Sequence, residues 1–329
     1  MVPALDGQIA GLAASIAAGA GGVILIGATP APDLAREIAN ANLRAALPLL
    51  VMADEEGGGI QRLAPLVGSL PWPRQMVATM STAQVQAAVG AVAARMRALG
   101  VQVDLAPVVD VDGGNGPSAT DPDGLRSFSA DPLTAARYSA AFVAGLRQGG
   151  VLSVAKHFPG LGGSTANTDY GPAATLSLST LRTTAIPVFS AAIAAGATGV
   201  MVANASVPGL TSGPASLSAA LIQQSLRDQL GFSGLVVTDS LSAGAIAAAH
   251  YTVAGAAVAA VEAGADLVLF GSTLTPADVA QLSPANVLAT TSGIIAGVAS
   301  AVRAGQLPES TLNEATVRVL AAKGHLCPG

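Results

Sequence analysis

The stretch VLSVAKHFPGLGGSTANTDYG, residues Val151–Gly171, decides how the rest of the chain is interpreted. Its first part, Val151–Ala155, is a β-branched and apolar run that predicts a strand. Lys156 and His157 stand where this run stops, and the sequence FPG at 158–160 then breaks the strand before a loop of small and polar residues. The chain has only two lysines and three histidines. One of each at the end of a strand therefore predicts a functional site.

The composition narrows the class of protein. Of 329 residues, 51% are hydrophobic and 11% are charged, which indicates a packed chain and not a disordered one. The net charge is −5 and no basic block occurs, which argues against a nucleic-acid partner and against an anionic membrane surface. No apolar run reaches the roughly 18 residues of a membrane span. The single cysteine, Cys327, allows no internal disulfide and no zinc cluster.

Short apolar segments alternate with helical patterns along the whole chain. We expect strands at Val2–Leu5, Gly22–Gly27, Leu49–Asp54, Val101–Val111, Val151–Ala155, Gly199–Val207, Gly234–Leu241 and Asp266–Gly271. Continuously apolar strands are buried on both faces, and their alternation with helices indicates a parallel sheet. Eight such units, without a GxGxxG or GxxxxGK[ST] fingerprint, favour an α/β fold with a closed (β/α)8 TIM-type barrel over an open nucleotide-binding sheet. No linker interrupts the pattern, so residues 1–329 are expected to form one domain.

Helices are expected between these strands and after the last one. The predicted ranges end at about Ala18 for the first helix and are Asp33–Ala46, Thr82–Leu99, Pro132–Gln148, Ser179–Ala195, Ser292–Ala304 and Glu309–Ala322 for the others. The first strand is at most Met1–Leu5, close to the minimum for a barrel strand. We therefore expect the chain to start late, with a truncated first strand and a frayed barrel bottom.

Polar residues gather where the predicted strands end. In a barrel of this kind, the chemistry belongs to the carboxyl ends of the strands. The residues found there are Asp54, Asp110, Asp112, Lys156, His157, Asn204 and Asp239. All but Asn204 are charged or titratable, in a chain with few such residues, and the set as a whole predicts one functional site.

Six ordered sequence blocks also resemble glycoside hydrolase family 3, and in particular its single-domain β-N-acetylglucosaminidases, or β-hexosaminidases. The blocks are DEEGGGIQR at 54–62, DLAPVVDV at 104–111, RSFSADP at 126–132, KHFPGLG at 156–162, PASLS at 214–218 and LGFSGLVVTDSLS at 230–242. They run through nearly the entire chain. The resemblance implies a TIM-type barrel and hydrolysis of glycosides.

The resemblance also assigns roles. It makes Asp239 the nucleophile of a retaining exo-glycosidase that releases terminal β-linked N-acetylglucosamine through a covalent glycosyl-aspartate, in cell-wall or peptidoglycan turnover. The residues that it implies for substrate binding are Asp54, Arg62, Arg126, Lys156, His157 and Asn204. Polar side chains in pairs suit vicinal sugar hydroxyls, which both donate and accept hydrogen bonds. The expected partner is a carbohydrate, and no metal or organic cofactor is indicated by ligand spacing.

The chain departs from the family where the acid/base is expected. The family loop after KHFPG normally ends in an Asp-x-His pair, but the chain has Asn167 and Asp169 at these positions. One hypothesis is that Asp169 replaces the histidine as acid/base, provided that burial or the charge of Asp239 raises its pKa. The other is a barrel that only binds sugar. A β-glucosidase-like exo-glycosidase is a further alternative, although many family β-glucosidases take their acid from a second domain.

The chain also departs from the family pattern at three other positions. Leu161 and Asn204 stand where the family often has histidine, and Gly59 where it usually has arginine.

The loop that carries Asp169 is rich in small residues, so we expect it to move and to close over a bound sugar. The sequence decides neither the aglycone nor the oligomeric state. A cytoplasmic location and, if a signal precedes this chain, the cell envelope both fit.

Overall fold

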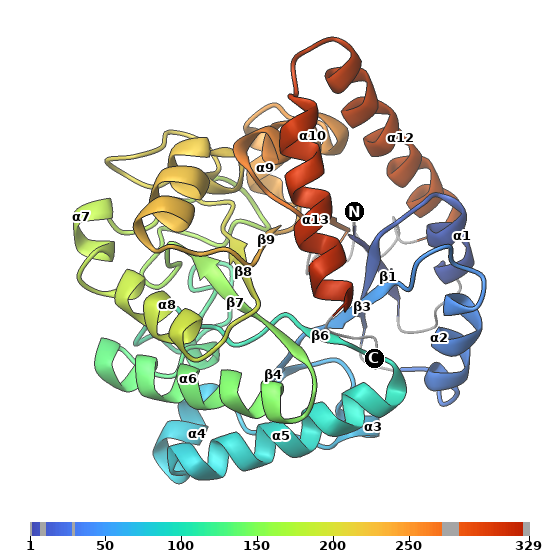
Figure 1. Cartoon of the computed structure of the whole chain (residues 1–329). Coiled ribbons are helices and arrows are strands. Elements are labelled where there is room, and N and C mark those ends of the chain that lie inside the picture. The colour runs from blue at the N-terminus through green and yellow to red at the C-terminus, as the bar shows by residue number, and fades with distance from the viewer. Residues whose placement is uncertain (1, 7–10, 28–29, 272–282, 325–329) are drawn as a thin grey trace.

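The computed structural model describes residues 2–6, 11–27, 30–271 and 283–324. Figure 1 shows a curled sheet with helices around its outside. The sheet contains eight parallel strands in the order β10-β1-β2-β3-β6-β7-β8-β9. Their bounds are Val2–Asp6 (β1), Gly22–Ile26 (β2), Leu50–Ala53 (β3), Val103–Asp104 (β6), Leu152–Phe158 (β7), Gly199–Val202 (β8), Leu235–Thr238 (β9) and Leu269–Phe270 (β10). A separate antiparallel pair is formed by Glu55–Gly57 (β4) and Ile60–Gln61 (β5).

Hydrogen bonds also join the two ends of the strand order. A parallel bridge links Val237 to Leu267, and the amide of Thr238 donates to the carbonyl of Leu267 at 3.0 Å. Further along, the amide of Leu241 donates to the carbonyl of Leu269 at 2.8 Å. The parallel sheet therefore curls back on itself, and the predicted α/β fold of TIM type is confirmed.

The first strand is paired, so the expected fraying is wrong, whereas the expected late start of the chain stays a prediction. All five residues of β1 pair in parallel register, Val2 and Pro3 with β10 and the next three residues with β2. Strand β2 is no longer than β1. In a curled sheet each strand has a neighbour on both sides, so even a short strand has partners for its backbone groups.

The helices follow the predicted pattern. They are Leu12–Ala17 (α1), Leu34–Asn42 (α2), Ala64–Val67 (α3), Pro73–Thr79 (α4), Thr82–Leu99 (α5), Pro132–Gln148 (α6), Leu178–Leu181 (α7), Ala185–Ala194 (α8), Gly244–Ala248 (α9), Val253–Ala263 (α10), Pro284–Arg303 (α12) and Glu309–Gly324 (α13). Shorter or irregular turns are Gly124–Arg126 (η1), Ala215–Leu217 (η2) and Ala220–Gln229 (η3). Helices α5 and α6 have the predicted bounds, because Ser81 and Asp131 accept from the first-turn amides and fix both starts.

Several predicted elements have other bounds in the structure. Strand β8 ends at Val202 and not at Val207, and helix α12 begins at Pro284 and not at Ser292. The helix expected over 179–195 is split into α7 and α8, because Thr183 and Thr184 turn their hydroxyls back to the carbonyl of Thr180. The strand expected over 101–111 contains only β6. Pro107 has no amide to donate to a ladder, and the chain beyond it keeps a single bridge from Val108 to Lys156.

A bulge in β7 changes the direction of two side chains. Between the pairs Ala155–Val200 and Phe158–Val202, strand β7 has two intervening residues and β8 has one. Residues of a regular strand alternate between the two faces of the sheet, so Lys156 and His157 would point apart. The extra residue re-aims the strand locally. It also carries β7 past Ala155, where the sequence predicted its end.

The apolar residues form layers inside and outside the sheet. Ile24, Met52, Val154, Met201 and Val237 belong to a cluster that fills the interior of the barrel. Neighbouring strand residues pack outward against the helices in two larger clusters. Burial on both faces explains why the strands are continuously apolar. Each strand is thereby held at a fixed height, and its carboxyl end reaches one common rim.

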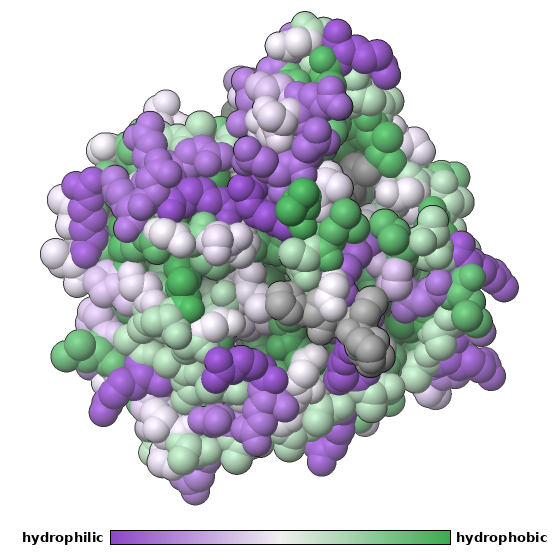
Figure 2. Space-filling model, viewed as in Figure 1, coloured by the Kyte–Doolittle hydropathy of each residue, from purple (hydrophilic) through white to green (hydrophobic). Residues whose placement is uncertain are grey.

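Helix α12 stands out on the surface. Among the described helices it alone has the length and the apolar composition of a membrane span, a criterion of little weight for a single helix. Figure 2 shows hydrophobic residues mixed with hydrophilic ones on the face that includes α12 and α13. Buried Val287, Ile294 and Ala301 anchor α12 to the domain.

The junction between β9 and β10 depends on one buried carboxylate. Asp266 accepts from the amide of Val236 at 2.8 Å and pairs with Arg227 at 2.7 Å and Arg318 at 3.0 Å. Removing one partner of a buried ion pair leaves an uncompensated charge. We therefore expect Asp266→Ala to lower the free energy of unfolding in urea by about 3 kcal/mol or more. The exposed Asp228→Ala is the control and should change it little; equal values for both variants would contradict this role.

Candidate active site

A pocket opens at the carboxyl ends of the strands, where the chemistry of TIM-type barrels is found. It brings together predicted site residues that come from five separate segments of the chain. Those that line it are Asp54, Arg62, Arg126, Lys156, His157, Asp169 and Asp239. Asn204 and two of the strand-end acids, Asp110 and Asp112, lie outside the described lining.

A buried ionic cluster forms one side of this pocket. Glu56, which is 1% exposed, binds the Arg126 guanidinium through two hydrogen bonds of 2.8 and 2.9 Å. Its Oε1 also lies 2.6 Å from the Lys156 ammonium, which in turn donates to Asp54 at 2.6 Å. Four side chains from three segments of the chain are thereby held together. The network fixes the donors and acceptors that the pocket presents.

The electrostatics of the cluster keep it ionised. Burial alone would raise the pKa of Glu56, but the charges of Arg126 and Lys156 outweigh it and hold this pKa well below its ordinary value. Burial alone would lower the pKa of Lys156, yet Asp54 and Glu56 raise it. Each charge is therefore stabilised by its neighbours, and the lysine stays a hydrogen-bond donor in the pocket.

Asp239 follows the last residue of β9 and is partly exposed to the pocket. Its amide donates to the carbonyl of Val202 at 3.0 Å, so the backbone before the side chain is tied to β8. Its Oδ1 accepts from the amide of Ser240 at 2.7 Å. The carboxylate is thus held at one oxygen by the backbone, in a fixed orientation at the rim.

Asn204 lies behind Asp239 and does not line this pocket. It is 2% exposed, donates to the carbonyl of Ser240 at 2.7 Å and accepts from the hydroxyl of Ser216 at 2.6 Å. Both ends of its amide are therefore used within the protein. In the structure it supports the turn after Asp239, in place of the expected contact with substrate.

The loop that carries Asp169 is tied to two neighbouring loops. The amide of Asn167 donates to the carbonyl of Ala119 at 3.0 Å. The amide of Gly244, at the start of α9, donates to the carbonyl of Asp169 at 2.9 Å. Asp169 is therefore held over the same pocket that Asp239 lines. The expected movement of this loop stays a prediction.

Trp72 explains one departure from the family pattern. A Cβ atom on Gly58 would lie 2.0 Å from the indole ring, and one on Gly59 would lie 2.9 Å from it. Gly58 has φ of +58°, which also favours glycine. Trp72 thus packs on the loop after Asp54 and is absent from the described pocket lining. The position of the usual arginine is filled by this contact.

His157 is oriented from behind by Asp110. The Asp110 carboxylate, 0% exposed, lies 2.8 Å from the imidazole Nδ1 and accepts from the amide of Leu161 at 2.8 Å. Burial and the charge of Arg126 lower the pKa of His157 to about 4, so the ring is neutral at neutral pH. Leu161, where the family often has histidine, packs with Ala173, Ala203 and Ala205.

Two buried acids of the site, Glu56 and Asp123, have no role predicted from the sequence. Glu56 stands inside the quoted block DEEGGGIQR, and a third carboxylate there was its only sequence signal. Asp123 precedes η1 in a loop without periodicity, and only the fold brings it beside His157, 4.0 Å from Nδ1. Both are fully or almost fully buried. In so apolar a chain, burial is the property that distinguishes them from solvated acids.

A TIM-type barrel that presents two carboxylates among fixed polar side chains has the features of a glycoside hydrolase. Residues 18–322 match the Glycosyl hydrolase family 3 N terminal domain. The chain belongs to glycoside hydrolase family 3.

Proteins that are similar to this chain are named as glycosyl hydrolases or hexosaminidases. The beta-hexosaminidase LpqI of Mycobacterium tuberculosis (strain ATCC 25618 / H37Rv) is 37% identical over 286 residues, which are 84% of this chain and 69% of that protein. A family 3 glycosyl hydrolase structure from Mycobacterium smegmatis str. MC2 155 has a TM-score of 0.84 and 34% identity, covering 98% of this chain and 94% of that one. A β-N-acetylhexosaminidase structure from Beutenbergia cavernae DSM 12333 also has a TM-score of 0.84, with 31% identity and coverage of 98% and 96%.

Glu55, the residue before Glu56 of the ionic cluster, makes the free energy of unfolding depend on pH. Burial raises the pKa of Glu55 from 4.5 to about 7, although the amide of Leu63 donates to its carboxylate at 2.6 Å. Between these two pH values the folded protein binds more protons than the unfolded chain, so its stability falls as pH rises. From pH 4.5 to above 7, the unfolding free energy of wild type should fall by about 3 kcal/mol relative to Glu55→Gln.

Urea titrations at several pH values measure this difference. Glu262→Gln, on the exposed side of α10, is the matched control and should follow wild type at every pH. Identical pH dependence in wild type and Glu55→Gln would show that Glu55 is not the group responsible.

Proposed function

We propose that the protein is a retaining exo-glycosidase that releases terminal β-linked N-acetylglucosamine, with Asp239 as nucleophile and Asp169 as acid/base. The observation that carries the proposal is that both carboxyl groups line one pocket beside the cluster of Glu56, Lys156 and Arg126. Retaining hydrolysis requires two carboxyl groups on opposite sides of the scissile bond. The hexosaminidase names of the similar proteins support the sugar.

The reaction has two steps. In the first, the Asp239 oxygen that is not held by Ser240 attacks the anomeric carbon, and the carboxyl of Asp169 gives its proton to the departing oxygen. In the second, the Asp169 carboxylate takes a proton from water, whose oxygen displaces Asp239 from the sugar. Each carboxyl group is thereby restored to its starting form.

The polar side chains of the pocket would hold the sugar. Lys156 and Arg126 can donate to hydroxyl oxygens, and Asp54 can accept from hydroxyl hydrogens. A neutral His157, whose Nδ1 hydrogen is used on the Asp110 carboxylate, can accept a hydroxyl hydrogen at its other ring nitrogen. Because these groups hold one another in place, little ordering remains to be done when a sugar binds.

Hydrolysis of aryl β-N-acetylglucosaminide and aryl β-glucoside tests the proposed substrate. The proposal expects a large preference for the former in kcat/KM, and retention seen by NMR of the first-formed anomer. The resemblance further implies peptidoglycan fragments as the source, so muropeptides with a terminal N-acetylglucosamine should release it. A preference for glucoside would favour a β-glucosidase-like enzyme. Binding of N-acetylglucosamine without any turnover would favour a sugar-binding protein.

The nucleophile can be identified directly. Asp239→Ala should reduce kcat by more than roughly four orders of magnitude, since a covalent catalyst is lost, while thermal unfolding stays close to wild type. A slow fluoro-sugar should form a stable adduct with the wild-type enzyme. Mass spectrometry should locate it on the peptide that contains Asp239, and an adduct on any other residue overturns the assignment.

The role of Asp169 can be separated by leaving group. Asp169→Ala should lose most activity on a disaccharide, whose leaving oxygen needs a proton, yet keep much of it on a dinitrophenyl glycoside. Azide should partly restore the second step because it replaces the base-activated water. Asp239→Ala serves as the comparison and should lose both substrates alike. Equal losses in Asp169→Ala, without azide rescue, would leave Asp169 only a structural part of its loop.

A further inference from the structure

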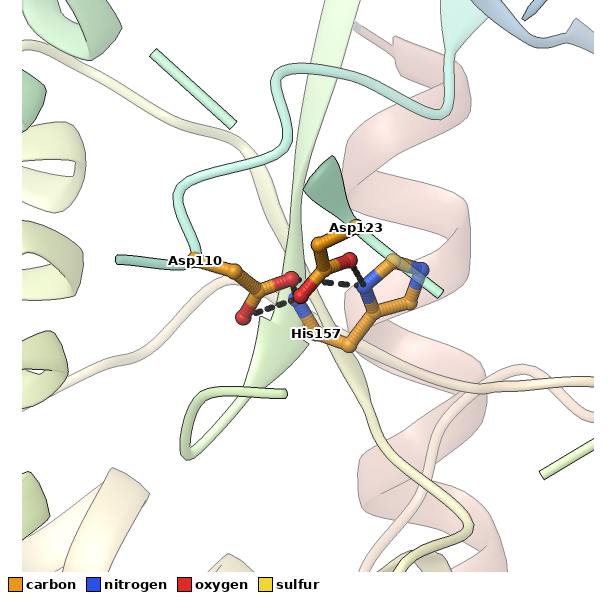
Figure 3. Close-up of side chains that lie close together, drawn as sticks. All are labelled: Asp110, Asp123 and His157. Carbon is orange, nitrogen blue, oxygen red and sulfur yellow. Dashed lines mark hydrogen bonds and ion pairs between the residues drawn. The ribbon is translucent and has the colours of Figure 1, made fainter. Parts of the chain in front are cut away.

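Three buried side chains behind the pocket form a separate polar cluster. Asp110 comes from the loop after β6, Asp123 from the residue before η1, and His157 from β7. Their exposed fractions are 0%, 0% and 6%. One oxygen or nitrogen atom from each lies within 4.8 Å of the others. Figure 3 shows both carboxylates on the Nδ1 side of the imidazole ring, while the second ring nitrogen lies on the far side.

Asp123 has no hydrogen-bond partner at either carboxylate oxygen among the described residues. Its nearest cationic neighbour is the Arg126 guanidinium at 3.8 Å, which is beyond hydrogen-bonding distance. That guanidinium already donates to Glu56 and to the carbonyl of Pro122. A fully buried carboxylate without a donor is strongly unfavourable, so the charged form of Asp123 needs a positive group beside it.

The charges of the two aspartates are also unbalanced. Arg126 is matched by Glu56, and Lys156 is matched by Asp54 together with Glu56. Among the described residues Asp110 has no lysine or arginine partner, and Asp123 has only the Arg126 guanidinium at 3.8 Å, which Glu56 already binds. A divalent cation between the two carboxylates would balance both charges.

We propose that Asp110, Asp123 and His157 bind a divalent metal ion, which holds the loop after β6 against the end of β7. The Nδ1 atom of His157 lies 2.8 Å from Asp110 and 4.0 Å from Asp123. Ligand atoms around an ion with bonds of about 2.0–2.2 Å lie roughly 3.0–3.5 Å apart. Both distances are close to this range, so small side-chain rotations complete the site.

The ligand set selects the kind of metal. Two carboxylates with one imidazole suit Zn²⁺ or Mn²⁺, whereas Mg²⁺ and Ca²⁺ prefer oxygen ligands alone. Binding through Nδ1 leaves the hydrogen on Nε2, the ring nitrogen that lies away from both carboxylates (Figure 3). The ion would not touch the sugar. It would fix the tautomer of His157 and the loop that leads to Arg126, and its binding can be measured without any hydrolysis.

The test uses the full chain without a metal-binding tag. After dialysis against EDTA, calorimetric titration with Zn²⁺ or Mn²⁺ should show one equivalent bound, and the metal should raise Tm by several degrees. Asp123→Asn should weaken binding at least about tenfold. The controls are Asp112→Asn, an acid of the same loop outside the cluster, and Asp239→Asn in the pocket; both should bind as wild type does.

A measurement on wild type removes any dependence on how the variants fold. Mn²⁺ at one equivalent should broaden the imidazole resonances of His157 and spare those of His250, which is not part of the cluster. Absence of stoichiometric binding would overturn the proposal. So would binding that Asp239→Asn abolishes, because the ion would then sit in the pocket. An Asp123→Asn protein that gains stability over wild type, with no metal effect in either, would show only a relieved buried charge.

Discussion

The pairing of Glu56 with both Arg126 and Lys156 is the interaction on which the pocket depends. Burying three charged groups is costly, and the cost is offset only because each group contacts an opposite charge at hydrogen-bonding distance. Glu56 and Arg126 come from the segments after β3 and β6, and Lys156 comes from the end of β7, so the network joins three neighbouring strand ends. A single carboxylate thus decides where the polar groups of the pocket stand.

The loops around this network support one another through the backbone. The segment with Asn167 and Asp169 is bonded to Ala119 on one side and to the start of α9 on the other. Asp239 in turn is held by the amide of Ser240, whose carbonyl accepts from Asn204. The two carboxyl groups of the proposed mechanism therefore belong to one connected rim. Their placement relies on hydrogen bonds between loops more than on any single element.

The charged side chains of the site lie in two layers, one at the pocket and one behind His157. The cluster with Glu56 faces the pocket and is balanced, whereas Asp110 and Asp123 lie behind His157 and are not. His157 belongs to both layers, because it lines the pocket and contacts Asp110. The proposed metal ion would neutralise the charges of Asp110 and Asp123. The ion would then hold His157 and the loop that leads to Arg126 in place without contacting the substrate itself.

The sequence by itself determined the α/β class, the positions of most strands and the bounds of α5 and α6, because apolar periodicity and N-caps are local properties. It also identified four residues that line the pocket, Asp54, Lys156, His157 and Asp239, because charge is rare in this chain and falls at strand ends. Arg62, Arg126 and Asp169 were predicted through the family resemblance. Only the tertiary structure decided that Lys156 and His157 reach the pocket together, because a bulge overrides the alternation of the strand. The tertiary structure also directs Asn204 away from the pocket and brings Asp123 beside His157. These contacts join residues 12 to 36 positions apart, and the bridge between Val237 and Leu267 closes the sheet. A local sequence pattern predicts neither, because both depend on how distant segments pack.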